Sequence, residues 1–397
     1  MFYYHKIVVQ HYPTLFMMFD FNKVYALERA FLKSIGIYPL NEMKYTCILI
    51  TSAIMAFVLV YLHFVLMLIQ LFCQVSNITK ASNILLYLMT HIAFVSKMTN
   101  FALNKHQMCL VDDILNNPIF KTVSLGETEI IVNSMVSSKY LSVVFRFLCV
   151  GVVLFYGIYP VIDISSENMY PLDLWYPFDP NSYHSTIILF EVSLIALGAW
   201  TNSNIDILTI KLISLGTAQI EILKKKLKSL VNNMEDVVTD EIVNTRLKHC
   251  IEHYSLILRY VKTVQDLFSK GIFVQFASSV VVICMTGFQF IVVPLQSMQF
   301  ILVLLYFQTM MCQVIMYCWY GHTIMESSSG ISMACYMSEW NRCSPKTCKM
   351  LMIFMERAKR PIRFYAGNYF VLNLATLMAI LRSSYSYFAV LQRLYKK

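Results

Sequence analysis

Ionisable side chains inside apolar stretches are the residues of this sequence that could do chemistry. Arg382 lies within the last apolar stretch, 367–394, and Glu191 and His91 lie within two others. A charged group at membrane depth is costly unless it is paired, neutralised or wet, so each marks a candidate functional site. Arg382 could line a water-filled path or contact a neighbouring helix. Glu191 could pair with His91, meet a polar ligand or serve a structural role.

Two short patterns resemble metal sites, but neither is complete. His249 and His253 lie one helical turn apart, yet no third ligand follows and Glu252 does not have the metalloprotease offset. Cys343 and Cys348 have no second cysteine pair with matching spacing. The sequence has no phosphate-binding glycine loop and no nucleophile–base spacing. We therefore predict no catalytic site, no metal and no cofactor.

Membrane-spanning helices are the elements that must position the ionisable side chains. Of the 397 residues, 57% are hydrophobic and 14% are charged, whereas soluble domains carry about 25% charged residues. Seven apolar stretches are long enough to cross a bilayer as helices. They lie at about 47–72, 84–103, 140–162, 185–210, 271–293, 299–320 and 367–391. We predict an all-α integral membrane protein with a single seven-helix domain, 1–397.

The basic residues outside these stretches predict the orientation of the chain. They concentrate in the N-terminal segment and in the second, fourth and sixth links, whereas the opposite side carries only Lys80, Arg393, Lys396 and Lys397. Lys and Arg are retained on the cytoplasmic side, so we predict a cytoplasmic N-terminus and an extracellular C-terminus. The glycosylation sequon at Asn77 would then be extracellular.

Two cytoplasmic links are predicted to be helical. Apolar residues recur at spacings of three and four in 211–270, on both sides of a polar break, and 321–366 contains an apolar helix ahead of a basic run. Such helices must bury their apolar stripe. We therefore expect a cytoplasmic anchor region in which these helices pack on each other or on other subunits.

The third link, 163–184, is acidic, aromatic and rich in proline and turn residues. Trp175, Tyr176 and Phe178 should not remain in water, so we expect this extracellular loop to fold over the outer mouth of the bundle as a lid. A loop that packs on the helix ends without any gating role is the alternative.

Three motifs resemble the insect odorant receptor family. Residues 171–179 (PLDLWYPFD) are close to the aromatic–proline pattern of that family's outer loop. Residues 384–388 (SYSYF), after Leu381-Arg382, are typical of its last helix. Residues 317–321 (YCWYG) and the region of Glu339-Trp340 resemble the end of its sixth helix and the cytoplasmic helix that follows.

The resemblance implies a subunit of a heteromeric, ligand-gated, non-selective cation channel. Such subunits assemble with an odorant receptor co-receptor, as a tetramer, in the plasma membrane of the olfactory sensory neuron dendrite. Their partners are a small, volatile, apolar ligand and membrane lipid, with no nucleic acid. The last helix would line the pore, with a hydrophobic gate at Val390 and Leu394 that closes by dewetting. Arg382 would then face either the pore or a neighbouring helix.

The resemblance also implies an odorant pocket in the outer half of the second, third, fourth and sixth helices. Such pockets are apolar and aromatic, with few polar groups. The candidate ligand-binding residues are Tyr87, His91, Phe94, Gly151, Phe155, Tyr159, Phe190, Glu191, Leu194, Phe300, Val303 and Leu304. Helix packing without ligand contact is the alternative for each.

Other receptor and transporter classes have different signatures. A gustatory receptor channel shares the architecture and inverted topology, but Trp175 and the SYSYF motif favour the olfactory family. A G-protein-coupled receptor requires an extracellular N-terminus, which the basic residues oppose. A secondary transporter commonly shows internal repeats with broken helices, and we find no repeat.

Overall fold

The computed structural model describes residues 16–39, 46–74, 78–162, 170, 172, 174–231 and 240–395. Its long helices are α2 (Thr46–Gln74), α3 (Ile78–Leu103), α6 (Leu125–Ile162), α7 (His184–Lys228), α8 (Asp240–Val292), α9 (Met298–Ser329) and α12 (Leu374–Tyr395). The shorter helices are α1 (Ala26–Ser34), α4 (Lys105–Leu115), α5 (Pro118–Lys121), α10 (Ile331–Tyr336) and α11 (Pro345–Ala358), with single turns η1 (Phe21–Lys23), η3 (Pro180–Tyr183) and η4 (Trp340–Arg342). Strand β1 (Phe16–Met18) pairs with β2 (Thr122–Ser124), and β3 (Tyr365–Ala366) pairs with β4 (Phe370–Val371), both antiparallel.

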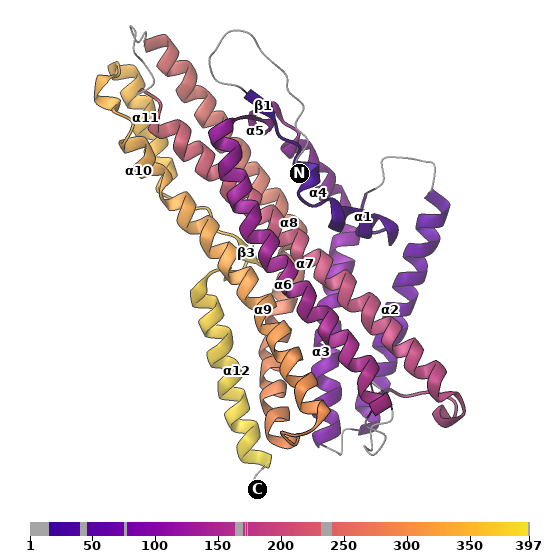
Figure 1. Ribbon diagram of the computed structural model, residues 1–397. Helices are drawn as coiled ribbons and strands as arrows, with labels where there is room; N and C mark the ends of the chain where they lie inside the picture. Colours follow the sequence, from indigo (N-terminus) through magenta and orange to yellow (C-terminus); the bar gives the residue numbers. More distant parts are fainter. Residues whose placement is uncertain are drawn as a thin grey trace.

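Seven of the described helices are long and apolar enough to cross a membrane. Each contains one of the seven predicted stretches, in whole or for most of its length. The chain is therefore an all-α, multi-pass membrane protein, as the sequence predicted. Figure 1 shows these helices running side by side, with the end of α12 at one end of the bundle and α10 and α11 at the other. We call the half that holds the end of α12 the distal half.

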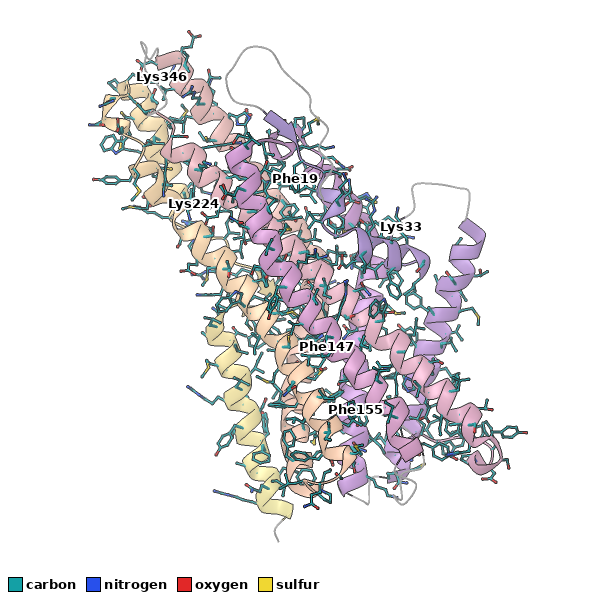
Figure 2. The ribbon with its side chains drawn as sticks, viewed as in Figure 1. Phe19, Lys33, Phe147, Phe155, Lys224 and Lys346 are labelled. Atoms are coloured by element: carbon teal, nitrogen blue, oxygen red, sulfur yellow. The ribbon has the colours of Figure 1, made fainter. Side chains whose placement is uncertain are left out.

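Helices α7 and α8 extend far beyond a membrane. They contain 45 and 53 residues, or about 68 and about 80 Å at 1.5 Å per residue, against a hydrocarbon core of about 30 Å. The amphipathic segments predicted in 211–270 are continuous with the spanning helices and do not form separate elements. Figure 2 shows Lys224 of α7 and Lys346 of α11 at the end of the bundle that carries α10 and α11, far from Phe155 of α6.

Helix α12 begins later than predicted. Residues 367–373, expected to be helical, instead contain the β3–β4 turn and β4, and the helix starts at Leu374. Gly367 and Asn368 carry the turn with φ of 59° and 64°, a left-handed conformation that glycine and asparagine tolerate best. Asn373 then caps the helix, because its side-chain oxygen accepts a hydrogen bond from the Thr376 backbone N–H at 2.8 Å.

The N-terminal segment is attached to the bundle by buried polar contacts. The hydroxyls of Tyr25 and Tyr38 donate to the Asp112 carboxylate of α4 at 2.7 and 2.9 Å. Burial, and then the neighbouring Asp112 charge, raise the pKa of both tyrosines, so both phenols remain neutral donors. Glu28 of α1 is fully buried and pairs with Arg146 of α6. These contacts hold α1 against α4 and α6.

Candidate functional site

A cavity of about 130 Å³ lies within the distal half of the bundle. Five helices and the loop before η3 form its walls, and most of its lining side chains are buried. The lining residues are His63 and Met67 of α2, Tyr87, Thr90, His91 and Phe94 of α3, Val152 and Tyr156 of α6, Leu172 of the loop, Leu194, Ile195, Gly198, Ala199 and Asn202 of α7, and Tyr306 of α9. An apolar, aromatic cavity with a few polar groups is the usual form of a small-molecule site.

Four of the residues predicted to bind the ligand line this cavity: Tyr87, His91, Phe94 and Leu194. On α3 all three predicted residues line the cavity, whereas on α7 only Leu194 of the three does.

The other predicted residues lie outside the lining. On α6, Gly151 and Phe155 each precede a lining residue, Val152 and Tyr156, by one position. One residue turns a helix by about 100°, so Gly151 and Phe155 lie at the depth of the cavity but on a neighbouring face of α6. The backbone of Tyr159 lies in α6, and its side chain lies outside the described residues.

The predicted residues of α9 are displaced from the cavity in the same way. Phe300 packs on Phe290 of α8, with ring centroids 5.5 Å apart. Val303 is buried and Leu304 is partly exposed, and neither lines the cavity, whereas Tyr306 does. Phe190 of α7 also lies outside the lining.

Eleven of the fifteen lining residues were not predicted, and three of them are informative because they lie where no candidate was named. His63 and Met67 lie in the first apolar stretch, and Asn202 lies near the end of the fourth. A histidine and an asparagine inside long apolar stretches were the signal that could have identified them.

Aromatic rings form two groups in the wall of the cavity. The Tyr87 ring meets the rings of Tyr156 and Tyr306 edge to face, with centroids 5.5 and 5.7 Å apart. His91 likewise meets His63 at 4.9 Å and Phe94 at 5.8 Å. Such edge-to-face pairs are favoured geometries that restrict side-chain motion. The cavity therefore presents a shaped surface to a ligand.

The hydroxyls of Thr90 and Tyr306 and the ring of His91 are already hydrogen-bonded. Thr90 pairs with Tyr306, joining α3 to α9. His91 Nε2 donates to the backbone oxygen of Val60 at 3.0 Å, since a carbonyl can only accept. The suggested pairing of His91 with Glu191 is therefore wrong: His91 is held by α2.

Three other polar atoms of the lining have no partner. His63 Nε2, Tyr156 Oη and Asn202 Oδ1 are buried, and none has a hydrogen-bond partner among the described residues. Buried polar atoms are normally satisfied, and an exception in a cavity is a candidate contact for a ligand.

Glu191 holds the loop that contributes Leu172 to the cavity wall. Its buried carboxylate accepts hydrogen bonds from the Leu172 backbone N–H at 2.9 Å and from the Tyr176 hydroxyl at 2.7 Å. Burial, and then the Glu191 charge, raise the pKa of Tyr176, so its phenol remains a donor. Leu172, held in this way, forms part of the cavity wall.

The loop packs through Leu172, Leu174 and Tyr176, whereas the other two residues predicted to leave water do not pack against the same cluster. Leu172 and Leu174 are buried in the apolar cluster of the distal half. Trp175 and Phe178 instead remain 38% and 47% exposed. Branched aliphatic side chains fit between the helix ends, while the larger rings stay at the rim.

A buried ion pair lies one helical turn beyond the cavity. Lys97 Nζ of α3 is 2.7 Å from Asp206 Oδ1 of α7, and their side chains are 3% and 0% exposed. The Asp206 carboxylate also accepts hydrogen bonds from the Tyr317 hydroxyl, at 2.6 Å, and from the Gln313 side-chain amide, both of α9. This cluster joins α3, α7 and α9, all of which line the cavity.

The last helix leaves one face uncovered. Ile380 and Ser384 are buried against the bundle, whereas Arg382, Ser386 and Val390 share an exposed face at spacings of four, and Val390 is 56% exposed. Arg382 forms no ion pair with the described residues. Figure 1 shows α12 at the edge of the bundle beside α9. The side chain of Leu394 and the whole of Asn77 lie outside the described residues.

No group of three or more His, Cys, Asp or Glu side chains that could hold a metal ion is found in the described part of the chain. Of the predicted histidine pair, His253 is fully buried, and its Nε2 is 3.0 Å from the Gln219 side-chain oxygen of α7. It joins α8 to α7.

Comparisons with known proteins agree with this architecture. The family model described as 7tm Odorant receptor matches residues 77–385. Odorant receptor Or1 of Anopheles gambiae is 25% identical over 351 residues, covering 81% of this chain and 83% of that protein. Odorant receptor 94a of Drosophila melanogaster is 22% identical over 319 residues, covering 80% and 81%.

The fold is also similar to that of a solved structure. The insect olfactory receptor OR5 from Machilis hrabei, in complex with eugenol, has a TM-score of 0.81 over 93% of this chain and 99% of that one, at 16% identity. At that identity, the likeness concerns the fold alone.

Proposed function

Because the chain belongs to the 7tm Odorant receptor family, we propose that it is the ligand-binding subunit of a heteromeric, ligand-gated, non-selective cation channel. The observation that carries this proposal is the distal cavity, which is aromatic, largely buried and lined by five of the seven candidate membrane helices. Small, volatile, apolar molecules fit such a site, because they lose little hydration on entering it.

The proposal places the distal half of the bundle on the extracellular side. The basic residues of the links support a cytoplasmic N-terminus and an extracellular C-terminus. In a sensory neuron, the receptor would then lie in the plasma membrane of the dendrite, with its cavity facing the odorant. Asn77, between α2 and α3, would be open to glycosylation.

The loop held by Glu191 is proposed to act as the lid of this cavity. Leu172 closes one wall and Tyr176 fixes the loop to α7. Trp175 and Phe178 lie exposed beside these contacts. A ligand entering from the extracellular side would have to displace this segment, which holds the site closed to water.

The pore is proposed to run along the uncovered face of α12. Val390 lies on that face, and a ring of such side chains with Leu394 from several subunits would close by dewetting. Arg382, also on that face, would lie in the water path or against the next subunit.

The co-receptor is proposed to dock on the end that carries α10 and α11. Large apolar side chains are exposed there, and surfaces of this kind mark protein interfaces. They are Met333, Tyr336, Met337, Met352 and Ile353. A tetramer that contains both kinds of subunit would bury them around a central axis.

Whole-cell recording tests this function. Cells expressing the chain with the co-receptor should give inward cation current to some members of an odorant panel, and eugenol belongs in that panel because the similar Machilis hrabei receptor was solved with it. Ala199→Leu, which fills the cavity, should abolish the response. Ala196→Leu, on the same helix but outside the lining, should retain it. A response that is unchanged by Ala199→Leu would contradict the placement of the site.

A further inference from the structure

The three unpartnered atoms of the cavity differ in what they can bond. Asn202 Oδ1 is a side-chain amide oxygen, so it can only accept a hydrogen bond. His63 Nε2 can donate or accept, according to the tautomer of the ring, and Tyr156 Oη can do either. All three atoms are buried without a partner among the described residues, and all three residues line the cavity. A molecule that satisfies the acceptor must therefore bring an O–H or N–H group.

The lining excludes a charged ligand. It contains no Asp, Glu, Lys or Arg, so an ammonium or carboxylate would lose its hydration without gaining a counter-ion. Glu191 does not change this, because its carboxylate is occupied by the Leu172 N–H and the Tyr176 hydroxyl of the loop. The hydrogen-bonding group of the ligand must be neutral.

The size and the walls of the cavity favour one aromatic ring. Its volume of about 130 Å³ is on the scale of the apolar cavity of about 150 Å³ that binds benzene. Tyr87, Phe94 and Tyr156 present ring faces and edges around it. An aromatic guest can join this edge-to-face arrangement, whereas a flexible chain would lose rotamer freedom on entry.

We propose that the cavity recognises a neutral, monocyclic aromatic molecule that carries one hydroxyl group, as in a phenol or a benzyl alcohol. The hydroxyl hydrogen bonds Asn202 Oδ1, and the hydroxyl oxygen meets His63 Nε2. This inference rests on the proposed function, since it assigns the ligand class of the same site. The hydroxyl selects the ligand because its absence leaves the Asn202 oxygen buried and unpaired in the complex.

A matched pair of ligands tests the inference. 4-Methylphenol and its methyl ether, 4-methylanisole, have nearly the same shape, but only the phenol can donate. In cells expressing the chain with the co-receptor, we expect the half-maximal concentration for 4-methylphenol to be lower by roughly 5- to 150-fold, the factor that corresponds to one unsatisfied buried acceptor. Equal potency of the two ligands, or greater potency of the ether, would overturn the proposal.

Variants locate the effect at the two atoms. Asn202→Leu should reduce the preference for the phenol to about threefold or less, and His63→Phe should reduce it in part. Thr201→Val is the control, because Thr201 lies next to Asn202 but outside the lining and its hydroxyl donates to the Leu197 backbone oxygen, so the preference for the phenol should not change. An undiminished preference in a surface-expressed Asn202→Leu receptor would overturn the assignment of the donor site.

The wild-type comparison stands even where a variant does not reach the surface. A wild-type receptor that responds to other odorants but not to 4-methylphenol would overturn the ligand class and leave the proposed function intact. A surface-expressed receptor with its co-receptor that gives no current to any odorant would instead overturn the proposed function. Calorimetry of 4-methylphenol with the purified complex shows whether a receptor without current fails to bind the ligand or binds it without opening.

Discussion

Replacing Lys97 with methionine should destabilise the bundle by about 3–5 kcal/mol, because it leaves the Asp206 charge buried without its counter-ion. The structure supports the upper part of that range. Asp206 is fully buried, and the lost contact is 2.7 Å long. The donors that remain, Tyr317 and Gln313, are neutral. Methionine retains the apolar stem that packs close to Gly271 of α8, so the change is one of charge more than of shape.

A second substitution should reverse most of this loss. In Lys97→Met/Asp206→Asn both charges are gone, and the amide oxygen still accepts from Tyr317. Removing both members of a buried ion pair is often close to neutral. Lys105→Met, on the exposed surface of α4, is the matched control and should lie within about 0.5 kcal/mol of wild type.

Thermal denaturation of the detergent-solubilised receptor complex, followed by size-exclusion chromatography, ranks these variants. The expected order of stability is wild type and Lys105→Met first, the double variant next and Lys97→Met last. A Lys97→Met receptor as stable as Lys105→Met would refute the reasoning, and so would a double variant less stable than the single one.

The remaining predictions concern the loop, the turn before α12 and the topology. Glu191→Ala should release the loop and weaken ligand responses several-fold. In the wild type, Tyr176 should stay protonated between pH 6 and pH 9, so its titration should not change the responses in that range. The pKa of Tyr176 is raised above 10.0, so its contact is complete below that pH and is lost only above the raised value; concentration–response curves at several pH values check both statements. Gly367→Ala should cost about 1–3 kcal/mol, because φ is positive and an added Cβ would lie 2.8 Å from Phe273 Cβ. Gly151→Ala in α6, where nothing lies within 4 Å, should be neutral or stabilising in the same denaturation assay. Asn77→Gln should abolish a glycosidase-sensitive shift on gels, and a wild-type receptor without such a shift would count against an extracellular α2–α3 link.

Hydropathy was sufficient to predict the architecture. A long apolar stretch indicates a membrane-spanning helix whatever its neighbours are, so the seven spanning helices were located from the positions of the apolar stretches alone. The turn at Gly367 and Asn368 was missed because the residues around it are apolar enough to continue a helix. Its positive φ values depend on the close approach of α8, which no local pattern encodes.

The cavity was predicted in depth but not in detail. Depth follows from counting residues along a helix, and Tyr87, Phe94 and Leu194 line the cavity; that they bind a ligand stays a prediction. The face of α6 depends on how that helix is rotated, and there the lining positions are Val152 and Tyr156. Rotation is set by packing between helices that are distant in sequence, which spacing within one helix cannot determine.

Polar partners were the least predictable feature. The carboxylate of Glu191 was considered as a partner of His91 or of a ligand, and it binds the loop instead. Lys97 lies within the second apolar stretch, and its pairing with Asp206 explains how that charge is tolerated there. Both assignments required the relative positions of different helices.

Excised outside-out patches give the most direct test of a channel opened by a ligand in the distal cavity. With the co-receptor present, with no nucleotide on the cytoplasmic side and with G-protein signalling blocked, an active odorant should open a cation conductance within milliseconds, and Ala199→Leu should abolish it while Ala196→Leu retains it. A current that disappears in the excised patch and returns only with G-protein signalling would contradict the account.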